Sequence, residues 1–304
     1  MERKIKIFFF CAIFALALFF RFYKLKDLPP GLYPDVAIYA NDAFYTLKTK
    51  NFKVFYEENN GREGLWMWIL AIFFKIFGTN VFVIKASCAI LGVLTVFGIY
   101  LLTKSLYEKE GLALFSSFLL AISFWHVNFS RIGFRVITWP LISSFAFYFL
   151  IEGLKTLKTK FFILAGIFFG LGFYTYTSFR LSVFVLPFLL FPFWQKYKKL
   201  NLTKKAFFSL FLFLLVTFFV ALPIGIFFLK NPGYFFSRMA PISVFSGENK
   251  MKELLKSFSF HVLMFNFYGD PNLRHNIPQK SMLFLPVGIL FLIGFFISCF
   301  KLKR

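Results

Sequence analysis

The sequence predicts an all-α membrane protein with about eight transmembrane helices and a large first outer loop, and composition already indicates this class. Of the 304 residues, 59% are hydrophobic and only 16% are charged, whereas a soluble domain averages about 45–50% apolar and about 25% charged residues. The mean hydropathy is +0.72. This composition excludes an ordinary water-soluble protein, and its apolar and aromatic content excludes a disordered chain.

The distribution of charge is the second observation behind this prediction. The chain has 35 Lys and Arg against 13 Asp and Glu, a formal net charge of +22, which in a soluble domain would suggest a nucleic-acid partner. Here most of the surplus lies in short Lys clusters between apolar runs, as in the cytoplasmic loops of membrane proteins. We therefore expect membrane lipid as a partner and no nucleic acid.

The third observation is a series of apolar runs that approach the roughly 20 residues a spanning helix needs. If the Lys clusters are all cytoplasmic, the runs alternate across the membrane without contradiction, and both termini lie in the cytoplasm. The first run is followed by large residues where signal-peptide cleavage needs small ones, so an uncleaved first span in the cell (plasma) membrane is expected. The expected spans are residues 7–22, 82–103, 111–128, 133–151, 161–177, 180–195, 206–229 and 282–300.

These spans organise residues 1–304 as one integral membrane domain. Prolines before residue 35 end the first span, and the segment 35–49 is expected to form an amphipathic helix. The run 65–77 is short for a span, so it is predicted to lie in the outer interface, with Trp66 and Trp68 near the lipid headgroups. The expected segments are the first span 7–22, an outer loop 23–80, six spans within 82–229, a second outer loop 230–281, and the last span with its basic tail 282–304.

The first outer loop contains the acidic residues that could carry chemistry. Asp35 begins the segment 35–49, and Asp42 lies two turns further along the same face. Taken locally, Asp35 is more often a helix cap and Asp42 a solvated residue. Glu63, in the turn before the run 65–77, has the same two interpretations: a cap for that helix, with Arg62 as a surface charge, or a functional carboxylate close to the membrane.

Cations gather in the short outer turns. Arg131 and Arg135 are four residues apart, a spacing that places them on one helical face, and Arg180 follows Tyr174 and Tyr176 in the next outer turn. Headgroup anchoring is the common explanation of such residues. The alternative is a binding site for a phosphate at the membrane surface, for which the planar guanidinium is well suited.

The second outer loop adds one more polar cluster. Residues 268–280 read YGDPNLRHNIPQK, with Arg274 and His275 at the centre of an irregular loop. A lone His in a polar loop is usually only a hydrogen-bonding residue. Each cluster is a weak signal, but together they place carboxylates, arginines and a histidine on the membrane face where a lipid headgroup would lie.

Five motifs along the chain resemble the polytopic glycosyltransferases of the C-type fold. The sequence is most similar to the bacterial relatives of the protein O-mannosyltransferases and of the aminoarabinose transferase of lipid A. The order and spacing of the motifs match that family. They are LPPGLYPD (28–35), NNGREGLWMW (59–68), FWHVNFSRIGFR (124–135), GLGFYTYTSFR (170–180) and GDPNLRHNIP (269–278).

The resemblance implies an enzyme that moves a sugar, a hexose or a pentose, from a polyprenyl-phosphate carrier to an acceptor lipid, glycan or protein on the outer face. It also implies that Asp35 is the catalytic acid of the first outer loop and that Glu63 is a second acid. His275 falls in the loop that supplies a metal-binding His in some relatives. The sequence has Asp35-Val36 where relatives often have Asp-Glu, and Gly64 where they often have Pro.

The chemistry of a lipid-phosphate donor assigns the remaining roles. The departing phosphate gains negative charge, so cations aimed at it lower the barrier, and a carboxylate on the opposite side of the sugar accepts the acceptor's proton. Asp35 is the expected base, with inversion at the anomeric carbon, while Glu63 and His275 could share a divalent metal; no organic cofactor is expected. The phosphate candidates are Arg131, Arg135, Arg180 and Arg274, and the further candidates are Asp42, Arg62, Tyr174 and Tyr176.

Two alternatives stay open at this point. The chain ends after its eighth expected span, where many relatives continue, so it could be a short or truncated family member that binds the carrier lipid without catalysis. The other alternative is a lipid or sugar transporter, although the sequence has no internal repeat and no acid at the centre of a span that would favour one.

Overall fold

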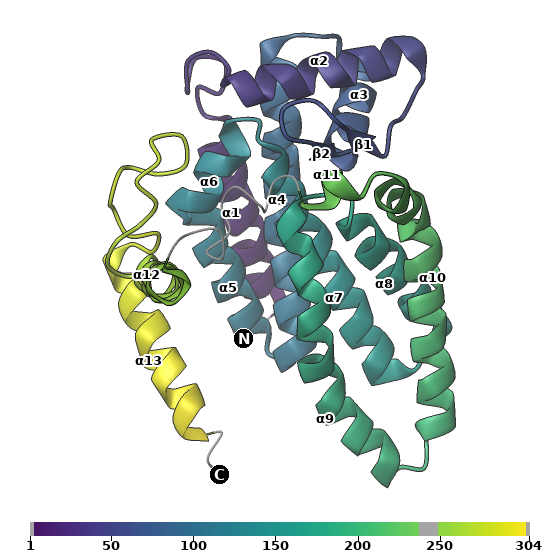
Figure 1. Cartoon of the computed structure of the whole chain (residues 1–304). Helices are drawn as coiled ribbons and strands as arrows, with labels where there is room; N and C mark the ends of the chain where they lie inside the picture. Colours follow the sequence, from purple (N-terminus) through teal and green to yellow (C-terminus); the bar gives the residue numbers. More distant parts are fainter. Residues whose placement is uncertain (1–2, 237–248, 302–304) are drawn as a thin grey trace.

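The computed structural model describes residues 3–236 and 249–301, and these residues are mostly helical (Figure 1). The helices of the bundle lie alongside one another, with α4 in contact with both α1 and α7. They are α1 (Arg3–Phe22), α4 (Val81–Tyr107), α5 (Glu110–Ile122), α7 (Thr138–Thr156), α8 (Thr159–Gly172), α9 (Val185–Lys199) and α10 (Thr203–Lys230).

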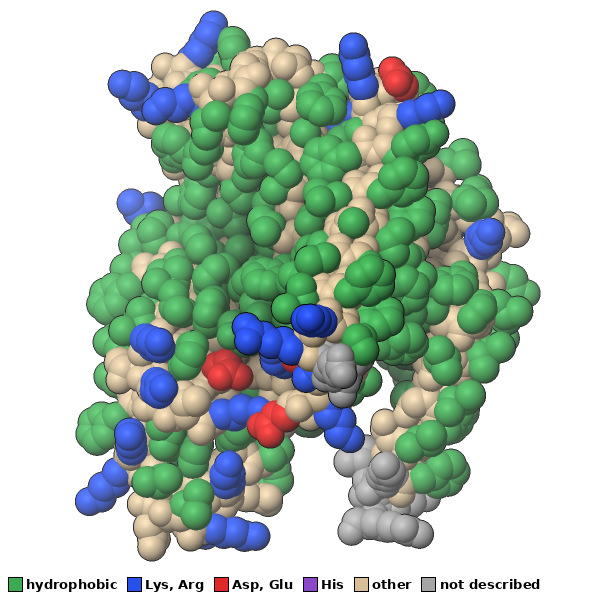
Figure 2. All heavy atoms as spheres, turned by 180° about the vertical axis from the view of Figure 1, so that it is seen from behind, with side chains coloured by type: hydrophobic (Ala, Val, Ile, Leu, Met, Phe, Trp, Pro, Cys, Tyr) green, Lys and Arg blue, Asp and Glu red, His purple; other side chains and the backbone are tan. Residues whose placement is uncertain are grey.

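The helix lengths confirm an all-α membrane protein. Within the described residues, five helices are long and apolar enough to cross a bilayer, and a sixth is obtained if α5 and α6 (Phe124–Arg131), bent by 58° at Ser123, form one span. Figure 2 shows hydrophobic side chains over the middle of one face, with Lys and Arg gathered toward its two ends. Of the other expected spans, α8 and α13 (Leu285–Lys301) are shorter apolar helices of 14 and 17 residues.

Two expected spans differ from the observed elements. The run 111–128 is not one straight helix, because the chain is extended at Ser123 and resumes in α6. The run 161–177 stops at Gly172, because residues 173–176 turn and lead into the 3-10 helix η2 (Thr177–Phe184), which continues into α9. Both differences place irregular backbone beside the outer loops.

Residues 23–80, the segment expected to be the first outer loop, fold into a cap over one end of the bundle (Figure 1). Helix α2 (Pro34–Thr49) confirms the expected amphipathic segment, since residues spaced three or four apart are buried: Val36, Tyr39, Ala43 and Thr46. It packs on α3 (Leu65–Phe77). The short strands β1 (Phe55–Tyr56) and β2 (Arg62–Glu63) pair antiparallel between them.

The expected position of Trp66 near the headgroups is wrong. Helix α3 contacts α2 on one side and α4 on the other, so Trp66, Met67 and Leu70 are fully buried in the core of the protein. Trp68 is half-buried; its Nε1 donates to the carbonyl of Lys53 at 2.9 Å. Packing against two helices thus overrides the simple interfacial pattern of the sequence.

Small residues allow a close contact between α8 and α10. A Cβ on Gly166 of α8 would lie 2.7 Å from Cβ of Val216, and one on Gly170 would lie 2.6 Å from Cβ of Val220. This spacing of two glycines with three residues between them lets helix backbones approach closely inside a membrane. It fixes α10 against α8 and so positions the C-terminal end of α10 beside η2, where Arg180 contacts Phe228.

The second outer loop contains α11 (Pro232–Phe236) and α12 (Lys250–Leu263), followed by an irregular loop that leads into α13. The expected second outer loop includes residues 237–248, and the expected basic tail includes residues 302–304; both stretches lie outside the described residues. The loop after α12 reaches the cap, so that Arg274 of this loop contacts Asp35 of α2.

Candidate active site

Asp35 lies at the second residue of α2, where Pro34 starts the helix. Its carboxylate accepts a hydrogen bond from Nδ2 of Asn59 at 2.8 Å and faces Nη1 of Arg274 at 3.0 Å. No side chain caps the N-terminus of α2. The helix-cap interpretation of Asp35 is therefore wrong, and the carboxylate instead faces residues from two distant segments.

Asp35 and Arg274 border a cavity of about 290 Å³ whose lining is half polar and half aromatic or aliphatic. The lining comes from α2, α6, the 3-10 helix η1 (Arg135–Ile137), the segment before η2, and the loop after α12. The cavity thus joins four of the five sequence motifs. Its lining residues are Asp35, Tyr39, Phe129, Phe134, Arg135, Val136, Tyr176, Arg274 and His275.

Glu63 is the centre of a buried ionic network behind this cavity. Its side chain is 2% exposed; it accepts from Nη1 of Arg135 and from Oγ1 of Thr177, the latter at 3.0 Å, and Nη2 of Arg180 lies 3.6 Å away. Burial by itself would raise the pKa of this carboxyl, but the Arg135 guanidinium outweighs it, so the pKa lies below its ordinary value.

This geometry revises the expected role of Glu63. Both of its oxygens are turned toward cations and a hydroxyl, it does not line the cavity, and no side chain caps α3. Neither the cap interpretation nor direct contact with a substrate in the cavity fits this position. Glu63 instead holds two arginines in place from the side away from the cavity.

Arg135 presents the positive charge of the inner cavity wall. Its side chain is 1% exposed, with the ring of Tyr176 stacked 4.7 Å from its guanidinium carbon. Within the described residues, its Nε and Nη2 have no hydrogen-bond partner. Because an unsatisfied buried donor is costly, these groups favour an anion as their partner.

Arg180 and Tyr174 are near this network but outside the cavity lining. Arg180 donates to the carbonyl of Phe235 at 2.8 Å, and its guanidinium carbon lies 4.1 Å from the Phe235 ring centroid. Tyr174 is buried, and its hydroxyl donates to the carbonyl of Val220 at 2.8 Å. Both residues therefore join the network to α10 and α11.

Arg131 does not share a face with Arg135. Helix α6 ends at Arg131, and Gly133 follows with φ of +81°, a left-handed conformation that turns the chain before η1. The guanidinium of Arg131 donates to the carbonyls of Phe20, Tyr23 and Leu28 at 2.8–2.9 Å. The expectation of one shared helical face is wrong, and Arg131 does not line the cavity.

Asp42 of α2 and Arg62 of β2 form another ion pair, with Oδ2 and Nη1 2.6 Å apart. Burial raises the pKa of Asp42 and lowers the pKa of Arg62, because both charged forms are taken from water. The expected solvated Asp42 is thus wrong, as is the expected surface charge of Arg62. The pair fixes β2, and with it Glu63, against α2.

The expected metal pair is not formed. Nδ1 of His275 lies 2.7 Å from Oδ2 of Asp270, and its ring packs against Phe129, whereas Glu63 belongs to the arginine network. A divalent cation at Glu63 would face Arg135 and Arg180 at close range. Within residues 3–236 and 249–301, no group of three or more His, Cys, Asp or Glu could hold a metal ion. These residues do not fit a shared metal site.

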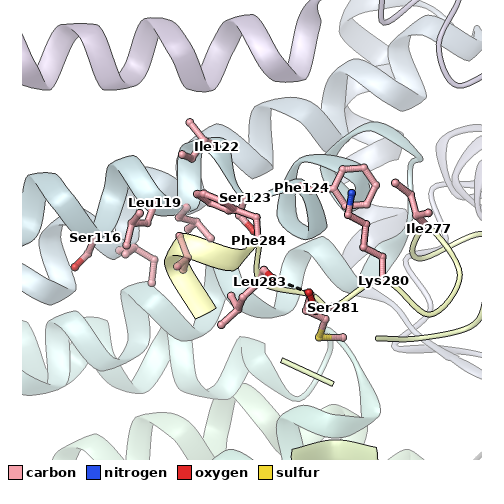
Figure 3. A pocket seen from close by; sticks show the side chains of 14 residues that line it. Ser116, Leu119, Ile122, Ser123, Phe124, Ile277, Lys280, Ser281, Leu283 and Phe284 are labelled. Carbon is pink, nitrogen blue, oxygen red and sulfur yellow. Dashed lines mark hydrogen bonds between the residues drawn. The ribbon is translucent and has the colours of Figure 1, made fainter. Parts of the chain in front are cut away.

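A separate apolar cavity of about 610 Å³ lies between α5 and the start of α13 (Figure 3). Side chains from α5, such as Leu119 and Ile122, face Leu283 and Phe284 across it, and Ile277 and Lys280 line its end toward the loop that carries Arg274. Lys280 is the one ionisable residue in its lining. The mostly apolar lining suits an apolar chain rather than a sugar.

Sequence reasoning missed the amides of the site. Asn59 donates to Asp35, and Asn128 donates to the carbonyl of His275 at 2.9 Å. Asn59 lies in the polar turn Asn59-Asn60-Gly61, and φ of +50° at Asn59 shows a left-handed conformation that asparagine tolerates. That turn signal could have pointed to Asn59; nothing in the local pattern singles out Asn128.

The bundle of apolar helices defines a multi-pass membrane protein, and the cavity at one end of it is backed by arginine. Residues 65–224, slightly more than half of the chain, match the family model of the dolichyl-phosphate-mannose-protein mannosyltransferases. The chain belongs to this family of membrane glycosyltransferases, whose donors are sugars on polyprenyl phosphates. No curated protein matches the chain. Asp35 and Arg274 both lie outside the matched segment.

Proposed function

We propose that the protein transfers a sugar, in the first instance mannose, from a polyprenyl-phosphate donor to a hydroxyl group of an acceptor lipid, glycan or protein at the outer face of the plasma membrane. The observation that carries this proposal is the pairing of Asp35 with Arg274 at the border of a cavity backed by Arg135. A base and two phosphate-binding cations thereby share one small polar space.

Asp35 is the proposed general base. Its carboxylate is partly exposed, at 28% of the side chain, so an acceptor hydroxyl can reach it. As the acceptor oxygen attacks the anomeric carbon, its proton passes to Asp35, and a base placed in this way contributes about 10²–10⁴-fold to a rate. Asn59 holds one carboxylate oxygen at 2.8 Å, which orients the other toward the cavity.

Arg274 and Arg135 are the proposed phosphate-binding residues. The bond between the anomeric carbon and the phosphate oxygen breaks, its electron pair goes to the phosphate, and the leaving group gains a negative charge. Arg274, 42% exposed at its side chain, can turn from Asp35 to that phosphate, which also frees the base. Cations that are stronger partners for the leaving dianion than for the donor monoanion lower the barrier.

Displacement in one step predicts inversion of the anomeric configuration. The acceptor must attack from the side opposite the phosphate, so base and cations belong on different sides of the sugar, as in single-displacement glycosidases. Arg274 lies 3.0 Å from Asp35 in the structure, so an in-line displacement requires it to turn away from the base toward the leaving phosphate. Arg135, on the inner wall of the same cavity, is the second cation available to that phosphate.

The apolar cavity between α5 and α13 is the proposed place for the isoprenoid chain of the donor. Ile277 and Lys280 line it, three and six residues after Arg274, so a phosphate at Arg274 would lie near its mouth. Burial of an apolar chain there would contribute affinity at roughly 25 cal/mol per Å². The Lys-rich loops at the opposite end of the bundle support a cytoplasmic side there and an outer-face site.

The direct test is sugar transfer by the purified protein in lipid vesicles. Undecaprenyl-phosphate-[³H]mannose is added with membrane extract as acceptor, and labelled product and released undecaprenyl phosphate are both measured. Label must move to acceptor material with inversion of the anomeric bond. If the donor stays uncleaved, the proposal is contradicted. If the uncleaved donor has in addition crossed the vesicle membrane, the transporter alternative is favoured.

A further inference from the structure

Helix α6 contacts both segments that meet at the Asp35–Arg274 pair. Nδ2 of Asn128 donates to the carbonyl of His275 at 2.9 Å and lies 3.4 Å from the carbonyl of Arg274. The adjacent Phe129 packs its ring 5.4 Å from that of His275. One turn of α6 thus holds the backbone at the centre of the second outer loop, nearly 150 residues further along the chain.

The same helix also holds the connector that leads to Asp35. Arg131 is three residues after Asn128, a spacing that places both on one side of a helix. Its guanidinium donates to the carbonyls of Phe20, Tyr23 and Leu28. These carbonyls lie at the end of α1 and in the connector that precedes α2, of which Asp35 is the second residue.

A further cation from the bundle fixes the same connector. Lys85 of α4 is 1% exposed, and its Nζ donates to the carbonyl of Pro29 at 2.6 Å. The connector is irregular, so its carbonyls lack helical partners, and hydrogen bonds to charged donors are stronger than neutral ones. Two cations from neighbouring helices therefore set where α2 begins.

The loop around Arg274 depends on α6 in a comparable way. Its hydrogen bonds include local ones, such as those from the backbone N–H of Asn272 to Asp270 and from the side chain of Asn276 to the carbonyl of Lys280. These bonds shape the loop but do not place it against the bundle. Asn128 does, since it bonds to the backbone of Arg274 and His275 from a helix of the bundle.

We propose that α6 positions both partners of the Asp35–Arg274 pair. Asn128 is a positioning residue whose amide holds the loop so that Arg274 faces Asp35, and Arg131 holds the connector that leads to Asp35. The expected effect on catalysis rests on the proposed function. The role of Asn128 in holding the loop does not depend on it. A displacement of about 1 Å from productive geometry can slow an enzyme by about 10²-fold. Loss of the Asn128 amide therefore slows transfer without removing any group that touches the substrate.

The activity test is a double-mutant cycle with transfer from undecaprenyl-phosphate-mannose in vesicles. Asn128→Ala and Asn128→Asp, which keeps the shape but loses the N–H donors, are expected to lower kcat about ten- to hundredfold. If Asn128 acts through Arg274, the double variant N128A/R274Q is as slow as R274Q alone. The matched control is Asn249→Ala, which removes the hydrogen bond that Oδ1 of Asn249 accepts from the backbone N–H of Lys252 at the start of α12 and is expected to leave kcat unchanged.

A second readout does not depend on activity. Hydrogen–deuterium exchange of the intact protein in nanodiscs is expected to rise several-fold in peptides covering residues 269–280 in N128A, and to stay at the wild-type level there in N249A. The proposal is overturned if exchange in N128A is unchanged, or if the losses of kcat in N128A and R274Q multiply in the double variant. If the wild-type protein transfers no sugar, the proposed function fails, and the exchange measurement still decides whether Asn128 holds the loop.

Discussion

Glu63 and Arg135 form an ion pair that is almost completely buried, with side chains 2% and 1% exposed. They come from β2 and η1, 72 residues apart. Taking two charges from water is expensive, so such a pair is better understood as a fixed geometry than as a source of stability. It places the Arg135 guanidinium at the cavity wall, where its buried Nε and Nη2 have no hydrogen-bond partner among the described residues.

Replacement of Glu63 tests this arrangement through stability. Glu63→Gln leaves the Arg135 charge buried without its partner, and loss of one member of a buried pair costs about 3–5 kcal/mol. We expect a lower Tm for E63Q at pH 7, measured by tryptophan fluorescence in detergent. Glu57→Gln, which changes an exposed carboxylate, is the control and is expected to unfold like the wild type.

The pH dependence of that difference has a definite sign. Because the pKa of Glu63 is lower in the folded protein, its contribution to the free energy of unfolding is fully present above the pKa of an unfolded Glu, about 4.3. It is lost as the pH falls through the lower folded pKa. The Tm difference between wild type and E63Q is therefore constant above about pH 5 and shrinks in more acidic solution. A difference that grows on acidification contradicts the assignment.

Asp35 is tested by a change that keeps its shape. Asp35→Asn removes the proton acceptor, while the new amide oxygen can still accept from Arg274 and its NH₂ can donate to Oδ1 of Asn59 once that amide turns over, so folding is expected to persist. Transfer from undecaprenyl-phosphate-mannose in vesicles is expected to fall by about 10²–10⁴-fold, whereas E57Q is expected to transfer normally. A D35N protein that retains more than a tenth of the wild-type rate shows that another group is the base.

Arg274 and Arg131 are expected to differ in phosphate binding. Arg274→Gln removes a cation from the cavity, so we expect the affinity for undecaprenyl phosphate to fall about tenfold or more, since hydrogen bonds to charged groups contribute about 1.5–3 kcal/mol. Arg131→Gln disturbs only carbonyl contacts of the connector and is expected to slow transfer with little change in that affinity. If both variants lose the same affinity for undecaprenyl phosphate, Arg131 also binds the phosphate.

The apolar cavity predicts a dependence on the length of the donor chain. Leu119→Trp fills part of it, so KM for undecaprenyl-phosphate-mannose is expected to rise while KM for geranyl-phosphate-mannose stays unchanged. Leu112→Trp, on the exposed side of α5, is the control. If both donors respond equally, the isoprenoid chain binds elsewhere.

Parts of the fold were predictable because they depend on local pattern. Apolar runs of sufficient length form helices in a bilayer whatever their neighbours, since every backbone group must be satisfied within the segment. The amphipathic helix 35–49 followed from Pro34 and from the spacing of its apolar residues. The break at Ser123 and the burial of Trp66 were not predictable, because they depend on which helices pack on each side.

The candidate site divides in the same way. Residue type and the family motifs selected Asp35, Arg135, Arg274 and His275, which the structure brings to one cavity. The roles of Glu63 and Arg131 were decided by partners that lie 72 and about 100 residues away in the chain. No periodicity reports such contacts.

The sequence by itself determined that this is an α-helical membrane protein, which residue types could handle a lipid phosphate, and that they lie in the loops between spans. Only the tertiary structure decided which cation faces which carboxylate. Ionic contacts act over a few ångströms in space, whereas a sequence records only distance along the chain. Asp35 and Arg274 are 239 residues apart, so only the folded chain shows that they form a pair.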